Sequence, residues 1–187
     1  MSSSKCIFLT GPPGIGKTTV ILRTVDLLKK HGFSVGGMIT REIRQGRSRV
    51  GFEIIDILTN RRGILAHIRF TSGPRVGKYR VNLRDLEEVG VCAIMEAIRK
   101  CDVVVIDEIG KMELFSDKFV KAVRTALSSG KIVLGTVHLR SSHPLAVEIR
   151  EGRMEGVSVI YVTYQNRAIL PEKILREVLS HVNRRDR

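Results

Sequence analysis

The chain of 187 residues has no tryptophan, few aromatic residues and only three cysteines. It contains no run that approaches the roughly 18 consecutive apolar residues of a membrane-spanning helix, so we expect no membrane segment. Cys6, Cys92 and Cys101 are scattered and lack the C-x-x-C spacing typical of a zinc site. Such cysteines indicate free thiols, which persist in reducing compartments. The first residues also lack the pattern of a secretory signal. We therefore expect a cytoplasmic protein.

Acidic residues are scarce as well, since 19 Asp and Glu accompany 32 Lys and Arg and the net charge is +13. The excess is concentrated in residues 41–80, where ten Lys and Arg accompany three acids. A positive field of this kind attracts nucleotides, nucleic acids or acidic partners, although a basic surface can also serve solubility alone. The length and the hydrophobic fraction of 43% predict one globular domain over residues 1–187.

The most informative motif is a phosphate-binding loop of the pattern G-x-x-x-x-G-K-[ST], made by Gly11-Pro12-Pro13-Gly14-Ile15-Gly16-Lys17-Thr18. An apolar run at 5–10 predicts a strand before it, and the apolar spacing at 19–31 predicts a helix after it. Backbone N–H groups of such a loop and of the helix N-terminus bind phosphate oxygens. We expect Lys17 to reach the β- and γ-phosphates and to take part in catalysis. We expect the Thr18 hydroxyl to ligate Mg²⁺.

Strand and helix patterns alternate along the rest of the chain. We expect strands at 33–40, 49–58, 63–68, 103–106, 131–136 and 157–162, and helices at 83–100, 118–129, 144–151 and 166–183. Residues 41–48 are expected to form a polar loop, and 59–62 the turn of a hairpin. This alternation predicts an α/β sandwich around a mostly parallel central sheet, with an inserted β-hairpin at about 47–81. In such sheets ligands bind at the carboxyl ends of the strands.

Two carboxylates, Asp107 and Glu108, follow the apolar run at 103–106. A phosphate-binding loop needs a metal-binding partner, and we expect Asp107 to hold Mg²⁺ opposite Thr18, through a water. Glu108 is placed to orient or deprotonate a water that attacks the γ-phosphate, which is the arrangement of a hydrolase. Lys111 is a candidate for phosphate contact, and Glu113 for pairing with an arginine.

Other candidates lie near the ends of further predicted strands. Thr136 and His138 close the strand at 131–136, where a polar residue can sense the γ-phosphate or the attacking water. An arginine usually neutralises the transition state of phosphoryl transfer, and Arg44, Arg41, Arg140 or an arginine from another subunit could supply it. Asn166 follows the last strand and is a candidate base contact. The chain has no N/T-K-x-D motif for guanine, so we expect loose base selectivity.

Several blocks resemble the archaeal and bacterial nucleoside-triphosphatase family, which has a vertebrate relative called the cancer-related nucleoside-triphosphatase. They are Phe8-Leu9-Thr10-Gly11-Pro12-Pro13-Gly14-Ile15-Gly16-Lys17-Thr18-Thr19, Val105-Ile106-Asp107-Glu108-Ile109-Gly110-Lys111-Met112-Glu113-Leu114-Phe115 and Leu134-Gly135-Thr136. Shorter likenesses occur at 44–46, 50–52 and 166–167, so the resemblance spans nearly the whole chain. The second block is far more specific than the phosphate loop alone.

This resemblance implies a P-loop NTPase fold, a three-layer α/β sandwich. It implies slow, Mg²⁺-dependent hydrolysis of ATP, GTP and other nucleoside triphosphates to diphosphate and phosphate, with low base selectivity. The implied nucleotide-binding segments are residues 11–18 and a second segment made of Val103, Val104, Val105, Ile106, Asp107, Glu108, Ile109 and Gly110. The resemblance assigns no function to the middle hairpin or the basic loop.

Two other functions fit the same residues. A small-molecule or nucleoside kinase would use the same phosphate site with an acceptor hydroxyl in place of water, and the basic hairpin could be its lid or acceptor clamp. A regulatory module gated by a nucleoside triphosphate could instead bind nucleic acid through the basic residues 41–80. That segment has only Phe52, Phe70 and Tyr79 as aromatic residues, so it shows no evident stacking platform.

Overall fold

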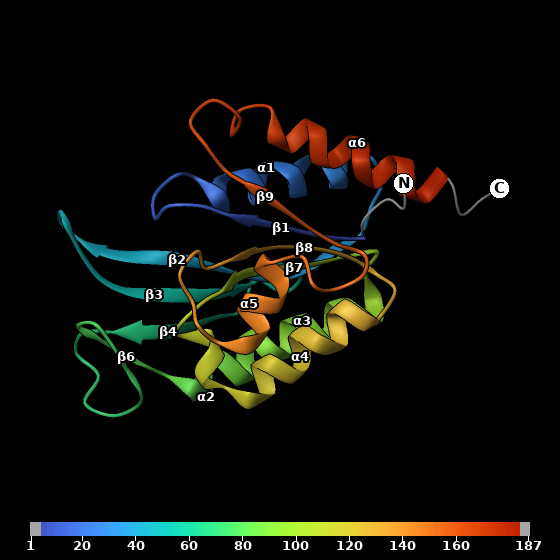
Figure 1. Ribbon diagram of the computed structural model, residues 1–187. Helices are drawn as coiled ribbons and strands as arrows, with labels where there is room; N and C mark the ends of the chain where they lie inside the picture. The colour runs from blue at the N-terminus through green and yellow to red at the C-terminus, as the bar shows by residue number, and fades with distance from the viewer. Residues whose placement is uncertain (1–4, 184–187) are drawn as a thin grey trace.

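The computed structural model describes residues 5–183, which build one wide β-sheet with helices on both faces (Figure 1). The strands are β1 (Cys6–Thr10), β2 (Val35–Gln45), β3 (Ser48–Asp56), β4 (Arg62–His67), β5 (Arg75–Val76), β6 (Tyr79–Val81), β7 (Val103–Ile109), β8 (Ile132–Val137) and β9 (Val157–Tyr161). The helices are α1 (Lys17–Lys30), α2 (Leu83–Asp85), α3 (Cys92–Lys100), α4 (Asp117–Ser128), α5 (Pro144–Arg150) and α6 (Leu170–Asn183). Residues 5–183 also contain a π-helical turn, η1 (Leu86–Val91), and a 3-10 turn, η2 (Glu113–Phe115). The strand order is β5-β6-β4-β3-β2-β7-β8-β1-β9.

Five neighbouring strands, β2, β7, β8, β1 and β9, are parallel. Helices α1 and α6 cover one face of this part, and α3, α4 and α5 cover the other (Figure 1). Along β7, Val103 and Val105 join the core under α1 and α6, whereas Val104 and Ile106 join the core on the opposite face. A strand that is buried on both faces must be apolar throughout. The predicted three-layer α/β sandwich is therefore confirmed.

The inserted region widens the same sheet, because β3, β4, β6 and β5 continue it through antiparallel pairs. The prediction of a loop at 41–48 is wrong. Strand β2 continues to Gln45, turns through Gly46 and Arg47, and pairs with β3 from Ser48 onward. The sheet is therefore parallel from β2 to its β9 edge and antiparallel from β2 to its β5 edge, so the predicted mostly parallel sheet with an inserted hairpin fits in part. The predicted insertion at about 47–81 otherwise matches β3 to β6.

Three further elements differ from their predictions by more than one or two residues at an end. Strand β7 runs on to Ile109, so Asp107 and Glu108 lie within it, and its pairing with β8 shifts in register between Ile106 and Ile109. The predicted helix at 83–100 is interrupted by η1, where Gly90 packs against the Met38 sulfur. The last helix starts at 170 instead of 166, because Asn166 folds the preceding residues into a hydrogen-bonded turn.

Across residues 5–183, no helix has both the length and the apolar character needed to cross a membrane. The three cysteines are free thiols, as predicted; Cys6 and Cys101 are buried and Cys92 is exposed.

Candidate active site

A cavity of about 600 Å³ opens at the carboxyl ends of β1, β7 and β8. The phosphate loop forms one wall, the segment after β7 and the loop after β8 form others, and the inserted strands close the far side. The lining residues are Gly11, Pro12, Pro13, Lys17, Thr40, Arg49, Phe52, Leu65, Val76, Glu108, Gly110, Lys111, Met112, Glu113, His138, Leu139, Arg140 and Tyr161. The predicted location at the strand ends thus coincides with this cavity.

The phosphate loop connects β1 to α1, as predicted, and α1 begins at Lys17 itself. Gly16 has φ 104°, a left-handed conformation that favours glycine. A Cβ at Gly11 would come within 3.0 Å of the Val162 carbonyl oxygen, so this turn also needs a glycine. No side-chain hydrogen bond caps α1, and its first turn has no acid. The N–H groups at this helix end are therefore suited to an anion.

The Lys17 ammonium lies at the mouth of the loop. Its Nζ donates hydrogen bonds to the carbonyl oxygens of Gly11 at 3.2 Å and Pro12 at 3.4 Å. The same side chain lines the cavity. Lys17 is therefore held over the loop in the position from which it can pair with phosphate oxygens.

Asp107 links the strands around the loop through two hydroxyl groups. Thr18 Oγ1 donates to its Oδ2 at 2.8 Å, and Thr136 Oγ1 donates to its Oδ1 at 2.6 Å. The carboxyl group is 1% exposed, and burial raises its pKa to about 6, although the two hydroxyl groups oppose this rise. The sequence-based pairing of Thr18 with Asp107 therefore corresponds to a direct contact, and Thr136 orients the carboxylate.

These residues fit a Mg²⁺ ion. Mg²⁺ prefers hard oxygen ligands, and in phosphoryl-transfer sites it takes one or two protein ligands and completes its shell with waters and phosphate oxygens. The Thr18 hydroxyl and the Asp107 carboxylate are ligands of this kind, side by side at the end of the phosphate loop. Over the described range 5–183 there is no cluster of three or more His, Cys, Asp or Glu that would hold a metal without substrate.

Two further carboxyl groups, those of Glu108 and Glu113, line the cavity. Burial raises the pKa of Glu108, while the positive charge of Lys17 opposes the rise. Burial, reinforced by the charge of Glu108, raises the pKa of Glu113 to about 8. A Cβ at Gly110 would come within 2.9 Å of the Glu113 Oε2 and 3.4 Å of the Glu108 carboxyl carbon, so glycine lets both groups approach the backbone. At neutral pH Glu113 therefore stays largely protonated beside Glu108.

The cavity is otherwise positive. Lys17, Arg49, Lys111 and Arg140 line it. Burial and the nearby charge of Lys111 lower the pKa of His138, so His138 is neutral near pH 7. Arg140 forms no ion pair with any residue in the range 5–183. Because the cations of the lining outnumber its ionised acids, the cavity favours a polyanionic ligand.

The structure does not bring every predicted residue to the cavity. Arg44 lies outside the lining and pairs with Glu42 at 2.7 Å. Asn166 uses its side chain to accept a hydrogen bond from the Thr163 N–H and to donate one to the Tyr161 carbonyl. The apolar residues Val103, Val104, Val105, Ile106 and Ile109 are fully buried and position the carboxylates without lining the cavity. Glu113 has no arginine partner within the described part of the chain.

Two arginines near the site were given no role from the sequence, although Arg167 lies in the segment expected near the base. Arg49 lines the cavity, with its guanidinium over the Phe52 ring at 5.0 Å. Arg167 donates from Nη1 to the Ile15 carbonyl of the phosphate loop at 3.3 Å and lies over the Tyr164 ring at 4.9 Å. The position of Arg167 directly after Asn166, at the end of the last predicted strand, was a usable signal for this contact. No such signal distinguished Arg49, because it lies in a segment that contains many arginines.

The chain is similar to known proteins over most of its length. A family model described as NTPase matches residues 6–175. A protein named nucleoside-triphosphatase THEP1, from Thermofilum pendens, is 49% identical over 97% of this chain and 100% of that protein. The cancer-related nucleoside-triphosphatase homolog of Mus musculus is 42% identical over 90% of this chain and 94% of its own length.

Two solved structures have the same fold. The crystal structure of THEP1 from the hyperthermophile Aquifex aeolicus is 37% identical, with a TM-score of 0.79, and covers 91% of this chain and 97% of its own. The solution structure of a human cancer-related nucleoside triphosphatase is 41% identical, with a TM-score of 0.76, and covers 93% of this chain and 97% of its own. The family model covers most of a chain that has a phosphate-binding loop, a Thr18–Asp107 contact and a cavity lined by Lys17 and Glu108, so the chain belongs to the NTPase family.

Proposed function

We propose that the protein is a Mg²⁺-dependent nucleoside-triphosphatase that hydrolyses ATP, GTP and other nucleoside triphosphates to diphosphate and phosphate. The observation that carries this proposal is that Lys17 and Glu108 line one cavity, while the residues next to them in the chain, Thr18 and Asp107, hydrogen-bond to each other. Phosphate binding, metal binding and water activation each have a residue in this group. The names of the similar proteins support the same activity.

The residues at the end of the phosphate loop bind the triphosphate. The uncapped N-terminus of α1 supplies N–H groups, and Lys17 exchanges its carbonyl partners for β- and γ-phosphate oxygens. Thr18 and Asp107 would hold Mg²⁺, which when bound neutralises charge that develops on the phosphates. Most of the catalysis is positioning and electrostatic stabilisation, because phosphoryl transfer needs little covalent help.

Glu108 is the base in this proposal. Its carboxylate borders the cavity and takes a proton from the attacking water, whose oxygen bonds to the γ-phosphorus while the bond to the β–γ bridging oxygen breaks. The raised pKa of Glu108 suits this role, since a base must be ionised before reaction and hold a proton afterwards. We propose Arg140 as the transition-state arginine in place of Arg44, because Arg140 lines the cavity without an ion-pair partner.

The base of the nucleotide is held by stacking in this proposal. The turn after β9 contacts the phosphate loop through Arg167, and beside it Tyr164 is 72% exposed. Asn166 is engaged by the backbone of its own turn, so it does not read a base edge. An exposed ring accepts any base on its face. Low base selectivity follows.

The basic segment 41–80 does not favour a nucleic-acid function. Four of its arginines pair with acids, namely Arg44, Arg49, Arg61 and Arg62. Tyr79 is buried and packs against Phe52 with ring centroids 5.2 Å apart, so these two rings do not form an exposed row on which bases could stack. We therefore propose that hydrolysis needs no nucleic acid.

The test is release of inorganic phosphate from ATP, GTP, CTP and UTP, with Mg²⁺ and with EDTA. The proposal requires release from all four nucleotides with Mg²⁺, specificity constants within about tenfold of one another, and loss of release with EDTA. Release from one base only, or release that EDTA does not change, contradicts it.

A further inference from the structure

The lining of the cavity includes residues beyond those expected to hold the triphosphate. Lys17 and Glu108 mark the γ-phosphate end and line the cavity, whereas Thr18 and Arg167 lie outside its lining. Arg167 contacts the phosphate loop at Ile15, on the side where the nucleoside is expected. This reasoning rests on the proposed function. It leaves the part of the cavity that faces the inserted strands without a role in nucleotide binding.

That outer part is walled by apolar side chains from three inserted strands. Phe52 comes from β3, Leu65 from β4 and Val76 from β5, and Met112 faces them from the segment after β7. Leu65 is 1% exposed and belongs to the hydrophobic core, and Phe52, Val76 and Met112 pack against that core, so core packing holds the wall in place. Phosphates bind to N–H groups and cations, and an apolar wall adds nothing to such binding. The wall suits the apolar body of another molecule.

Arg49 adds one cationic group to this wall. Its guanidinium stacks over Phe52, its Nε donates to the Tyr79 hydroxyl at 3.0 Å, and its Nη1 pairs with Glu42 at 2.7 Å. Its Nη2 makes no hydrogen bond to any residue in the range 5–183. The side chain is thus held by its Nε and Nη1 contacts, and the N–H groups of Nη2 are available for an anion.

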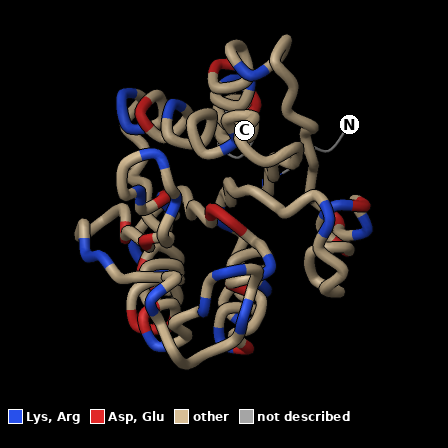
Figure 2. Tube along the Cα trace, turned by 90° about the vertical axis from the view of Figure 1, so that its left-hand side faces the viewer, with Lys and Arg blue, Asp and Glu red and all other residues tan. Residues whose placement is uncertain are grey.

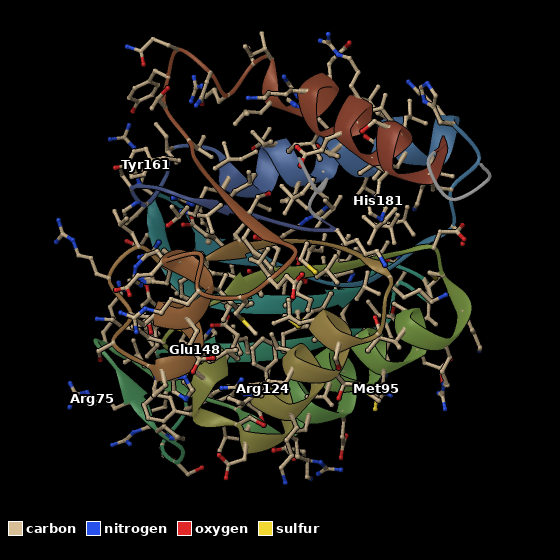
Figure 3. All side chains as sticks on the ribbon, turned by 45° about the vertical axis from the view of Figure 1, so that its right-hand side comes forward. Arg75, Met95, Arg124, Glu148, Tyr161 and His181 are labelled. Carbon is tan, nitrogen blue, oxygen red and sulfur yellow. The ribbon has the colours of Figure 1, made fainter. Side chains whose placement is uncertain are left out.

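The opening of this part lies at the strand ends. In Figure 3, Tyr161 and Arg75, the latter next to Val76, lie on the same side of the molecule, and Met95 lies on the opposite side. Figure 2 views the molecule from the ends of the inserted strands and shows Lys and Arg positions dispersed around this face. A small anion would therefore be attracted to the opening.

We propose that the outer part of the cavity binds a second substrate, a small alcohol with an apolar body and one anionic group, which accepts the γ-phosphoryl group. The hydroxyl oxygen bonds to the γ-phosphorus, the bond to the β–γ bridging oxygen breaks, and the hydroxyl proton passes to Glu108. The products are a phosphate monoester and a nucleoside diphosphate. Hydrolysis is then the reaction that occurs when water occupies the place of the alcohol.

The experiment uses 4-(hydroxymethyl)benzoate, which has a primary hydroxyl, an aromatic body and one carboxylate. The protein is incubated with Mg²⁺ and GTP, and phosphorus NMR separates inorganic phosphate from the phosphate monoester. We expect a monoester that saturates with the probe concentration, together with less inorganic phosphate per GDP. The matched probe 4-methylbenzoate, which lacks the hydroxyl, is expected to suppress phosphate release without forming an ester. Benzyl alcohol, which lacks the carboxylate, is expected to need at least about tenfold more compound.

Two substitutions test whether the aryl carboxylates bind in the outer part of the cavity. Val76→Trp fills the outer part of the cavity and should raise the half-saturating concentration of both aryl carboxylates at least about tenfold. The matched control is Met95→Trp, a change at an exposed residue on the opposite side, which should leave both concentrations unchanged. Ester formation that Val76→Trp does not weaken would overturn the proposed location.

The outcomes separate this inference from the proposed function. Absence of phosphate release without any probe contradicts the triphosphatase itself. Normal phosphate release, with no ester and no suppression by either aryl carboxylate, overturns the acceptor site alone. Suppression by both compounds without ester overturns the transfer step. The wild-type comparison of the three probes needs no variant, so the inference stays testable if Val76→Trp does not fold.

Discussion

Ionisation of the buried Asp107 carboxyl group lowers the free energy of unfolding, and a single substitution should reveal this effect. Its carboxyl group is 1% exposed, and its pKa is raised from 3.8 to about 6. One pKa unit corresponds to about 1.4 kcal/mol, so ionising this group costs the folded protein about 3 kcal/mol relative to the unfolded chain. Because the folded pKa is the higher one, stability is fully present below the unfolded value of 3.8 and falls as the pH rises through about 6.

Asp107→Asn removes this cost. An amide resembles the protonated acid, and the hydroxyl groups of Thr18 and Thr136 can turn to donate or accept. In EDTA at pH 8 we expect the variant to be more stable by up to about 3 kcal/mol, which corresponds to a melting temperature about 6–12 °C higher. The gain should shrink as the pH approaches 4, where Asp107 of the wild type also becomes protonated.

The assay is thermal unfolding of both proteins between pH 4 and pH 8, with phosphate release measured in parallel. Phosphate release by Asp107→Asn should be strongly reduced, since the metal loses its charged ligand. A variant that melts at or below the wild-type temperature at pH 8, or a difference between the proteins that is independent of pH, would refute the reasoning. Metal carried over from purification would hide the gain, so the EDTA condition is essential.

Three other predictions concern the loop, the base and the sheet. Lys17→Ala should weaken the affinity for a non-hydrolysable triphosphate by about 10- to 100-fold, because a charged hydrogen bond contributes about 1.5–3 kcal/mol; unchanged calorimetric affinity contradicts the assignment. The rate of phosphate release should fall with decreasing pH at values above the usual pKa of 4.5 for a glutamate, since Glu108 acts ionised and its pKa is raised; a profile that stays flat down to pH 4.5 argues against it. Gly135→Ala should destabilise the fold by at least about 1–3 kcal/mol, because its Cβ would lie 2.4 Å from the Ile106 carbonyl oxygen and 2.8 Å from the Phe8 ring; an unchanged melting temperature would contradict the close packing of β8.

The sequence predicted the structure correctly at positions where the backbone or the chemistry admits few residue types. The phosphate loop could be placed because its glycines, Lys17 and Thr18 occur at fixed spacing between a strand and a helix pattern. The apolar run at 103–106 had to be a buried strand, since both faces of β7 are covered. The chemistry of a metal-bound triphosphate predicted that Thr18 and Asp107 lie near one another, and the structure joins them by a hydrogen bond of 2.8 Å.

The far wall of the cavity could not be predicted because it depends on register. Strand β2 shifts its pairing with β3 between Ile43 and Arg44, and β3 shifts its pairing with β4 between Phe52 and Glu53. Such irregularities change which side chains face the cavity, and a polar, Arg-rich stretch gives no alternation from which to read them. Arg49 and Phe52 were therefore missed, and the sequence could not choose among Arg44, Arg41 and Arg140.

The role of Glu108 is the central claim, and one substitution tests it most directly. Glu108→Gln keeps the size of the side chain and removes the base, so phosphate release with Mg²⁺ and GTP should fall at least about tenfold, and up to about 10⁴-fold. Affinity for a non-hydrolysable triphosphate, measured by calorimetry, should stay within about threefold, because Glu108 carries none of the phosphate-binding groups. Turnover at the wild-type rate by a variant that binds normally would contradict the account.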